Sequence, residues 1–285
     1  MATIRDLLAW GSRELAALER PTHEASLLLA GACGWSKEKL FAAITDSPSE
    51  EAEKRFRGWV ALRAAGRPAA YLLGEKEFYG RTFRCDPRAL IPRPDTETVV
   101  ERALELARRR DPDGKGLRIH DCCTGTGCIA ITLALELKEA EVTASDISLE
   151  ALELARENCE RLAPGRVAFF ASDLLETVPR PPVDILTANP PYLTREETEA
   201  ALAEGWGEPS IALDGGESGV DLIDRLIEEA MESLNKNGYI LIEAADHQAE
   251  DIRHLLRLRG YREIETFTDL AGLERLTVGR YGSDH

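Results

Sequence analysis

The chain has 285 residues, 44% of them hydrophobic, which is enough for one large or two smaller domains with buried cores. Its 35 lysines and arginines against 51 acidic residues give a formal net charge of −16, so its average field repels nucleic acids and anionic membranes. No apolar run approaches the roughly 20 residues of a membrane-spanning helix, and the N-terminal residues lack a secretory pattern, so we expect a cytoplasmic protein. The six cysteines form no C-x-x-C pair and have no histidine at zinc-ligand spacing, which favours reduced thiols and predicts no metal site.

The first 70 residues show helical periodicity. Apolar residues recur at helical spacing from Ile4 to Ala32. Ser47, Pro48 and Glu50 predict the start of a further helix, with Ser47 as its N-cap. Because no catalytic constellation is present, residues 1–70 are predicted to form a small helical bundle.

Residues 71–90 have a different rhythm. The aromatic residues Phe78 and Phe83 flank a turn signal at Gly80, which predicts a short β-hairpin. We interpret residues 71–90 as a hairpin linker between two domains.

Residues 91–285 alternate apolar strand candidates with amphipathic helix candidates. The strand candidates are "LRIHDCC", "EVTASD", "RVAFFASD", "VDILTANPPY" and "YILIEA". Alternation of this kind implies crossover units and an α/β fold with a doubly wound, mainly parallel sheet. The final pair, "REIETFTD" and "ERLTVGRY", has a short connection containing Gly272, which predicts an antiparallel hairpin at one edge. Ligands of such sheets bind beyond the carboxyl ends of the strands.

The first strand end to consider is "DCCTGTG", which runs from Asp121 to Gly127. An acid, a turn of small residues and a helix start bring backbone N–H groups close to a ligand. Gly125 and Gly127 are also compatible with a simple tight turn, so this motif alone is weak evidence.

The next two strand ends carry acids. Asp146 follows Gly127 by 19 residues, close to the ~20 at which an acid binds ribose hydroxyls in doubly wound folds. The alternative is that Asp146 caps a helix that starts near Ser148. Asp173, in "SDL", is predicted to lie beside an adenine ring. Together these positions favour a nucleoside pocket.

The fourth strand ends in "TANPPY", residues 187–192. The Asn189 side-chain oxygen and the Pro190 carbonyl are two hydrogen-bond acceptors, and the prolines fix the backbone around them. The ring of Tyr192 can pack against a flat group. The segment therefore predicts a clamp for a planar amino group, the alternative being a turn that ends the strand.

These motifs together resemble the class I S-adenosylmethionine-dependent methyltransferases, and "NPPY" is typical of the members that modify amino groups, DNA adenine-N6 methyltransferases included. "LIPRPDTE", "EPSIALDGGESGVD", "ERLTVGRY" and the N-terminal helical segment resemble the release factor glutamine N5-methyltransferases over almost the whole chain. This resemblance implies methyl transfer from S-adenosyl-L-methionine, with S-adenosyl-L-homocysteine as the product. The implied acceptor is the side-chain amide nitrogen (N5) of the glutamine in the Gly-Gly-Gln motif of class I peptide chain release factors.

The resemblance also implies residue roles. The cofactor-binding positions are Cys123, Thr124, Gly125, Thr126, Gly127, Asp146, Asp173, Leu174 and Asn189. The catalytic positions are Asn189, Pro190 and Tyr192, and the substrate-binding positions are Asn189, Pro190, Pro191, Tyr192 and Arg93. The family usually has glycine at the place of Cys123, so we expect Cys123 either to keep a negative φ or to displace the loop. The family often has an aromatic residue at the place of Leu174, which predicts aliphatic packing against adenine here.

The resulting domain prediction is an N-terminal helical substrate-recognition domain (1–70), the hairpin linker (71–90) and a methyltransferase domain (91–285). Two alternatives remain open. An adenine-N6 nucleic-acid methyltransferase would share the amino-group clamp, but the net charge of −16 argues against it. A non-catalytic S-adenosylmethionine-binding module would not need the intact "NPPY" segment.

Overall fold

The computed structural model describes residues 2–178, 182–269 and 271–282. The chain forms two compact units, residues 1–75 with 201–207 and residues 76–200 with 208–285. The boundary falls after Glu75, so the hairpin groups with the second unit instead of separating the two. The domain boundaries expected from the sequence stay predictions.

The first unit is the expected helical bundle. Its helices are α1 (Ile4–Glu14), α2 (Pro21–Cys33), α3 (Lys37–Ala42), α4 (Glu50–Ala64) and α5 (Ala69–Leu73). Leu7, Leu28 and Phe56 lie in its buried core. The predicted N-cap Ser47 is wrong by two residues, because Ser49 is extended and its hydroxyl accepts from Ala52 N at 3.2 Å.

The hairpin consists of β1 (Glu75–Phe78) and β2 (Arg81–Arg84). Its two central residues, Tyr79 and Gly80, have φ of 50° and 68°, as a two-residue hairpin turn requires. The predicted range of 71–90 is too wide for this hairpin. Residues 71–73 are the last of α5, which ends at Gly74 in the left-handed region.

The second unit is built on one mixed sheet. Within the described residues its strands are β3 (Arg118–Cys122), β4 (Glu141–Asp146), β5 (Val167–Ala171), β6 (Val183–Ala188), β7 (Leu234–Glu243), β8 (Arg262–Thr268) and β9 (Glu274–Arg280). Their order is β5-β4-β3-β6-β7-β9-β8. The first five strands are parallel, and β9 pairs antiparallel with both β7 and β8. This arrangement confirms the doubly wound sheet with an antiparallel C-terminal hairpin.

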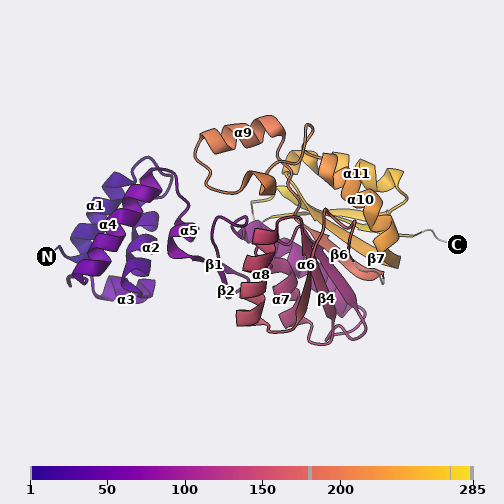
Figure 1. Ribbon diagram of the computed structural model, residues 1–285, viewed down its shortest axis with the longest axis horizontal. Coiled ribbons are helices and arrows are strands. Elements are labelled where there is room, and N and C mark those ends of the chain that lie inside the picture. Colours follow the sequence, from indigo (N-terminus) through magenta and orange to yellow (C-terminus); the bar gives the residue numbers. More distant parts are fainter. Residues whose placement is uncertain (1, 179–181, 270, 283–285) are drawn as a thin grey trace. The chain divides into compact units, whose positions relative to one another are not determined.

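Helices cover both faces of this sheet (Figure 1). The helices of the unit are α6 (Glu97–Arg108), α7 (Cys128–Glu136), α8 (Leu149–Leu162), α10 (Asp221–Ser233) and α11 (Ala249–Leu258), and α9 (Arg195–Ala203) spans the boundary between the units. One core cluster joins α6 and α7 to the sheet, and another joins α10 and α11 to it. Short 3-10 turns occur at η1 (Pro94–Thr96), η2 (Ser210–Ala212) and η3 (Asp246–Gln248).

The direction of the crossovers reverses between the neighbouring strands β3 and β6. A reversal of this kind opens a crevice at the carboxyl ends of the two strands. Cys122 is in register with Ala188, and Ala188 is in register with Ile242. The residues that follow them, Cys123, Asn189 and Glu243, are therefore brought to the same edge of the sheet.

Candidate active site

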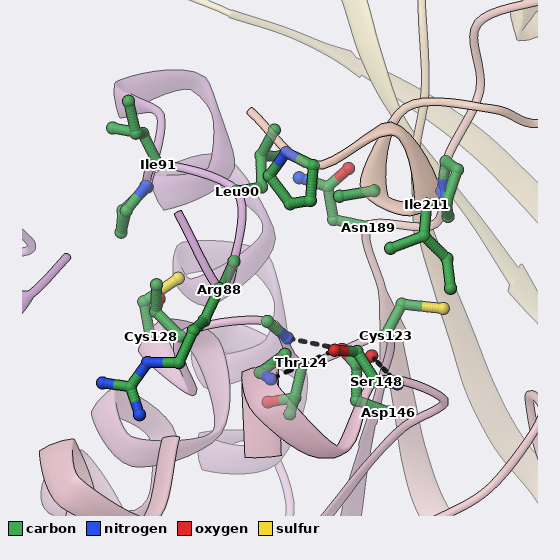
Figure 2. A pocket seen from close by; sticks show the side chains of 18 of the residues that line it. Arg88, Leu90, Ile91, Cys123, Thr124, Cys128, Asp146, Ser148, Asn189 and Ile211 are labelled. Atoms are coloured by element: carbon green, nitrogen blue, oxygen red, sulfur yellow. Dashed lines mark hydrogen bonds between the residues drawn. The ribbon is translucent and has the colours of Figure 1, made fainter. Parts of the chain in front are cut away.

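A pocket open to solvent lies at this edge (Figure 2). Its lining comes from the segment 88–93, Thr96, the loop after β3, the end of β4, Asn189, Pro191 and η2. A second cavity shares five lining residues with the first: Cys123, Asp146, Ile147, Pro191 and Ile211. In Figure 2, Asn189 and Ile211 lie toward one end of the first cavity and Asp146 toward the other.

The loop after β3 has an unusual backbone. Cys123, Gly125 and Gly127 have φ of 57°, 54° and 80°. The negative φ expected as one of two outcomes for Cys123 is wrong, because the residue adopts the left-handed conformation, at a cost of about 1–2 kcal/mol for an L-residue. Gly127 also needs its small size, since a Cβ there would lie 2.9 Å from Ile131 Cδ1.

The buried carboxylate of Asp121 is hydrogen-bonded to this loop. Its carboxylate accepts from Thr124 Oγ1 at 2.6 Å and from Thr187 Oγ1 at 2.8 Å. Burial raises the pKa of Asp121 to about 7, against the opposing effect of these two hydrogen bonds. Asp121 therefore joins the loop after β3 to β6.

The carboxylate of Asp146, at the end of β4, is also hydrogen-bonded to this loop. Its two carboxylate oxygens accept from Gly125 N and Ser148 N, each at 2.9 Å (Figure 2). Burial raises the pKa of Asp146 above its ordinary value. The N-cap of α8 is Ser148, which accepts from Ala151 N, and Asp146 binds the backbone N–H of that N-cap residue, so Asp146 supports the helix start without being its N-cap, and its ribose-binding role stays a prediction. Each oxygen keeps a lone pair for a further donor.

Asp173 and Leu174 line the second cavity. The Asp173 carboxylate pairs with the Arg225 guanidinium at 2.6 Å. Leu174 is buried with φ of 47°, and its carbonyl accepts from Ser145 Oγ at 3.2 Å. The Leu174 side chain therefore lines the second cavity, and its packing against adenine stays a prediction.

Asn189 is oriented by two residues from other elements. Its Nδ2 donates to Glu243 Oε1 at 3.0 Å and to Thr96 Oγ1 at 3.4 Å. The side-chain oxygen of Asn189 is thereby left to accept a hydrogen bond. Asn189 lines the cavity, and its binding and catalytic roles stay predictions.

The backbone of the rest of the "NPPY" segment contacts Gln248, Gly215 and Gly219. Gln248 Nε2 donates to the Tyr192 carbonyl at 2.8 Å, and burial raises the pKa of the Tyr192 phenol. A Cβ at Gly215 would lie 2.7 Å from the Pro191 carbonyl oxygen, and one at Gly219 would lie 2.6 Å from the Tyr192 carbonyl oxygen. The glycines of "DGGESG" are therefore needed for this close approach.

The structure does not bring every predicted residue into the two cavities. Pro191 lines both, whereas Gly127, Pro190 and Tyr192 line neither. Arg93 lines the first cavity, and its guanidinium pairs with the buried Glu208 at 2.5 Å. The substrate-binding role of Arg93 stays a prediction.

Two buried acids of the site were missed by the sequence reasoning. Glu208 accepts from Ile91 N at 3.0 Å as well as from Arg93, and so ties the segment 88–93 to the residues just before η2. Glu243 is 3% exposed, and burial raises its pKa to about 7. The available signal was that "YILIEA" ends a strand with an acid, as the second and third strands do.

Comparison with known proteins places the chain. Residues 6–74 match the PrmC N-terminal domain, and residues 105–206 match the methyltransferase small domain. The release factor glutamine methyltransferase of Moorella thermoacetica is 39% identical, over 96% of this chain and 96% of that protein. That of Bordetella pertussis is 40% identical, over 91% and 94%. The chain belongs to the release factor glutamine methyltransferase family.

Membership in the release factor glutamine methyltransferase family confirms the predicted enzyme class, an S-adenosylmethionine-dependent protein glutamine methyltransferase. A solved methyltransferase from Pyrococcus furiosus is 18% identical, with a TM-score of 0.54 over 82% of this chain and all of that one, and supports the class I fold. Among the described residues, no helix is long and apolar enough to cross a membrane, and no three potential metal ligands cluster.

Proposed function

We propose that the chain methylates the side-chain amide nitrogen (N5) of the glutamine in the Gly-Gly-Gln motif of class I peptide chain release factors. The observation that carries this proposal is the orientation of Asn189, whose Nδ2 is bound by Glu243 and Thr96. Its Oδ1 then accepts from an N–H of the substrate. The names of the relatives support a release factor as the protein substrate.

The residues around the two cavities fit S-adenosylmethionine. The loop 123–127 offers backbone N–H groups beside the start of α7, and its positive φ values allow a close approach. Asp146 keeps lone pairs for the ribose hydroxyls, and Leu174 offers an apolar surface to adenine. Bound there, the cofactor supplies an electrophilic methyl group.

Acceptor positioning is the main task of the "NPPY" segment. A primary amide nitrogen is a poor nucleophile because its lone pair is delocalised into the carbonyl, so its direction must be fixed. Asn189 Oδ1 accepts one of its two N–H groups, and the carbonyl of Pro190, which lines neither cavity itself but lies between the lining residues Asn189 and Pro191, is the proposed acceptor of the other. Orientation of this kind contributes about 7–11 kcal/mol in well-aligned reactions. The new N–C bond replaces the S–C bond, and the amide proton leaves to solvent.

The N-terminal unit is proposed to hold the remainder of the release factor. Within its described residues it has a buried helical core and lines neither cavity. Phe41 is 54% exposed there and offers apolar surface to a protein partner.

Mass spectrometry of a release factor incubated with the full chain and S-adenosylmethionine tests the proposal. We expect one added methyl on the side chain of the Gly-Gly-Gln glutamine. A parallel incubation uses an adenine-containing oligonucleotide at low and high salt, because phosphate contacts make binding steeply salt-dependent. Methyl on adenine, with none on glutamine, would refute the assignment.

A further inference from the structure

Three side chains from different elements form a hydrogen-bonded group behind the acceptor end of the cavity. They are Thr96 of η1, Asn189 after β6 and Glu243 at the end of β7. Thr96 Oγ1 donates to Glu243 Oε1 at 3.1 Å, and Asn189 Nδ2 donates to the same oxygen at 3.0 Å. Thr96 and Glu243 are 2% and 3% exposed, so water does not compete for these bonds.

Glu243 fixes which groups donate and which accept hydrogen bonds in this group of side chains. An ionised carboxylate only accepts hydrogen bonds, so Glu243 draws the hydroxyl hydrogen of Thr96 toward itself. Thr96 then presents only lone pairs to Asn189. Both neighbours of the Asn189 amide are therefore acceptors, and the amide satisfies them only with Nδ2. Its Oδ1 is turned away from them as a consequence.

We propose that Glu243, assisted by Thr96, is a positioning residue that fixes the Asn189 amide in the orientation whose oxygen accepts from the substrate amide. This inference rests on the proposed function, because a glutamine amide presents N–H groups to Asn189. The reversed orientation presents Nδ2 to those N–H groups, and two donors that face each other in a buried site are both left unpaired.

Protonation of Glu243 removes this fixed pattern of donors and acceptors. A neutral carboxyl has a hydrogen that Asn189 Oδ1 accepts, so the reversed amide becomes competitive. Burial raises the pKa of Glu243 to about 7, and Asp95 adds to the increase, while Arg275 and the hydrogen bonds from Thr96 and Asn189 oppose it. Its Oε2 is buried with no hydrogen-bond partner in the described part of the chain, which adds to the cost of the charge.

Two further groups interact with Glu243 electrostatically, the Tyr192 phenol and the Cys128 thiol, and burial raises the pKa of each above its ordinary value. Both are therefore neutral at pH 6–8. Methyl transfer by the wild type should accordingly increase as the pH rises through about 7, because the ionised fraction of Glu243 increases.

The test measures kcat on a class I release factor, and the Kd for S-adenosylhomocysteine by calorimetry, between pH 6 and 8. Glu243→Met removes the acceptor and should lower kcat about 10- to 100-fold, as misplaced groups do, with the Kd changed less than about 3-fold. The side chain in Glu243→Gln can present either its accepting oxygen or its donating NH₂ group to Asn189. This variant should therefore lower kcat and abolish the increase around pH 7. Thr96→Val should lower kcat, and Thr96→Ser should restore it.

Asp184→Asn is the matched control. Asp184 is a buried acid of β6 that accepts from Arg110, Arg118 N and Asn235, and it does not line the active-site cavities. Its neutralisation should lower the thermal midpoint and leave the pH profile of kcat unchanged.

Asp121 has a pKa of about 7 as well, so it is an alternative source of the pH dependence. If the increase around pH 7 persists in Glu243→Gln, it belongs to Asp121 or another group, and the inference fails.

A second readout does not depend on the substrate. The Asn189 side-chain NH₂ resonances, assigned by comparison with Asn189→Ala, should shift as wild-type protein passes pH 7 and should not shift in Glu243→Gln. Identical behaviour of the two proteins would overturn the inference. If the wild type methylates no glutamine, the proposed function fails, and the resonances alone decide the role of Glu243.

Discussion

The two strand ends at the crossover reversal are constructed in different ways. The loop 123–127 after β3 is shaped by its backbone, through three positive φ values and hydrogen bonds from its own N–H groups. The segment 189–192 after β6 depends on a side chain whose orientation is fixed by Thr96 and Glu243. Changes in the first region should therefore act on cofactor binding and stability, and changes in the second on methyl transfer.

Asn189→Ala should have the largest effect. Loss of one preorganised hydrogen-bonding group typically costs a factor on the order of 100 in kcat, equivalent to about 2.7 kcal/mol. Single-turnover methylation at saturating S-adenosylmethionine measures this loss, and calorimetry with S-adenosylhomocysteine should show a much smaller change in Kd. Asn235→Ala, which removes a half-buried amide bound to Asp184, is the control. A loss that lies entirely in cofactor affinity would remove the contrast between the two regions.

Gly127→Ala should show the opposite pattern. The new Cβ meets Ile131 and Ala155 and requires φ near 80°, so we expect a loss of about 2 kcal/mol in the free energy of unfolding. Cofactor affinity should fall as well, because the loop must shift. Gly165→Ala is the matched control, since Gly165 has φ of 72° and open space around it, and it should cost only about 1 kcal/mol. Equal costs for both variants would show that packing at Gly127 is unimportant.

The same contrast explains what the sequence could predict. Asp121, Gly125, Gly127 and Asp146 lie within 26 residues and have fixed local roles, so their grouping was recognisable from spacing alone. Glu243 is 54 residues from Asn189, and only the pairing of β6 with β7 brings them together. The acid at the end of "YILIEA" marks Glu243 as a strand-end residue, but no local pattern pairs it with Asn189.

Other differences have local physical causes. The sequence offers two serines before α4, and Ser49 rather than Ser47 became the N-cap because its hydroxyl accepts from Ala52 N. The left-handed conformation of Cys123 could not be predicted, since an L-residue avoids it unless the surrounding backbone demands it. Here Thr124 N donates to Ser145 O and fixes the loop that follows.

Asp121→Asn tests the support beneath the loop through pH. The folded-state pKa of Asp121 is raised to about 7, so its contribution to stability is present below the unfolded pKa and is lost as the pH rises toward 7. The free energy of unfolding of Asp121→Asn, minus that of the wild type, should therefore increase between pH 5 and 8. Urea unfolding at each pH measures it. A difference that stays constant with pH would assign an ordinary pKa to this buried carboxyl.

Cys123→Gly should have the smallest effect. Glycine relieves the left-handed strain of about 1–2 kcal/mol but loses about 0.5–1 kcal/mol of chain entropy on folding. We expect a stabilisation below about 1 kcal/mol in urea unfolding, with little change in the Kd for S-adenosylhomocysteine. A large loss of cofactor affinity would instead assign the Cys123 side chain a direct role in binding.

The most direct test of the proposed amide clamp uses a release factor whose Gly-Gly-Gln glutamine is replaced by glutamate. The carboxylate has the same length as the amide but no N–H for Asn189 Oδ1 and the Pro190 carbonyl to accept, so both acceptors would be left unpaired at about 1–3 kcal/mol each. Quantitative mass spectrometry should find one methyl on glutamine in the factor without the substitution and none on glutamate in the variant. A methyl ester on that glutamate, formed at a comparable rate, would contradict selection by an acceptor pair.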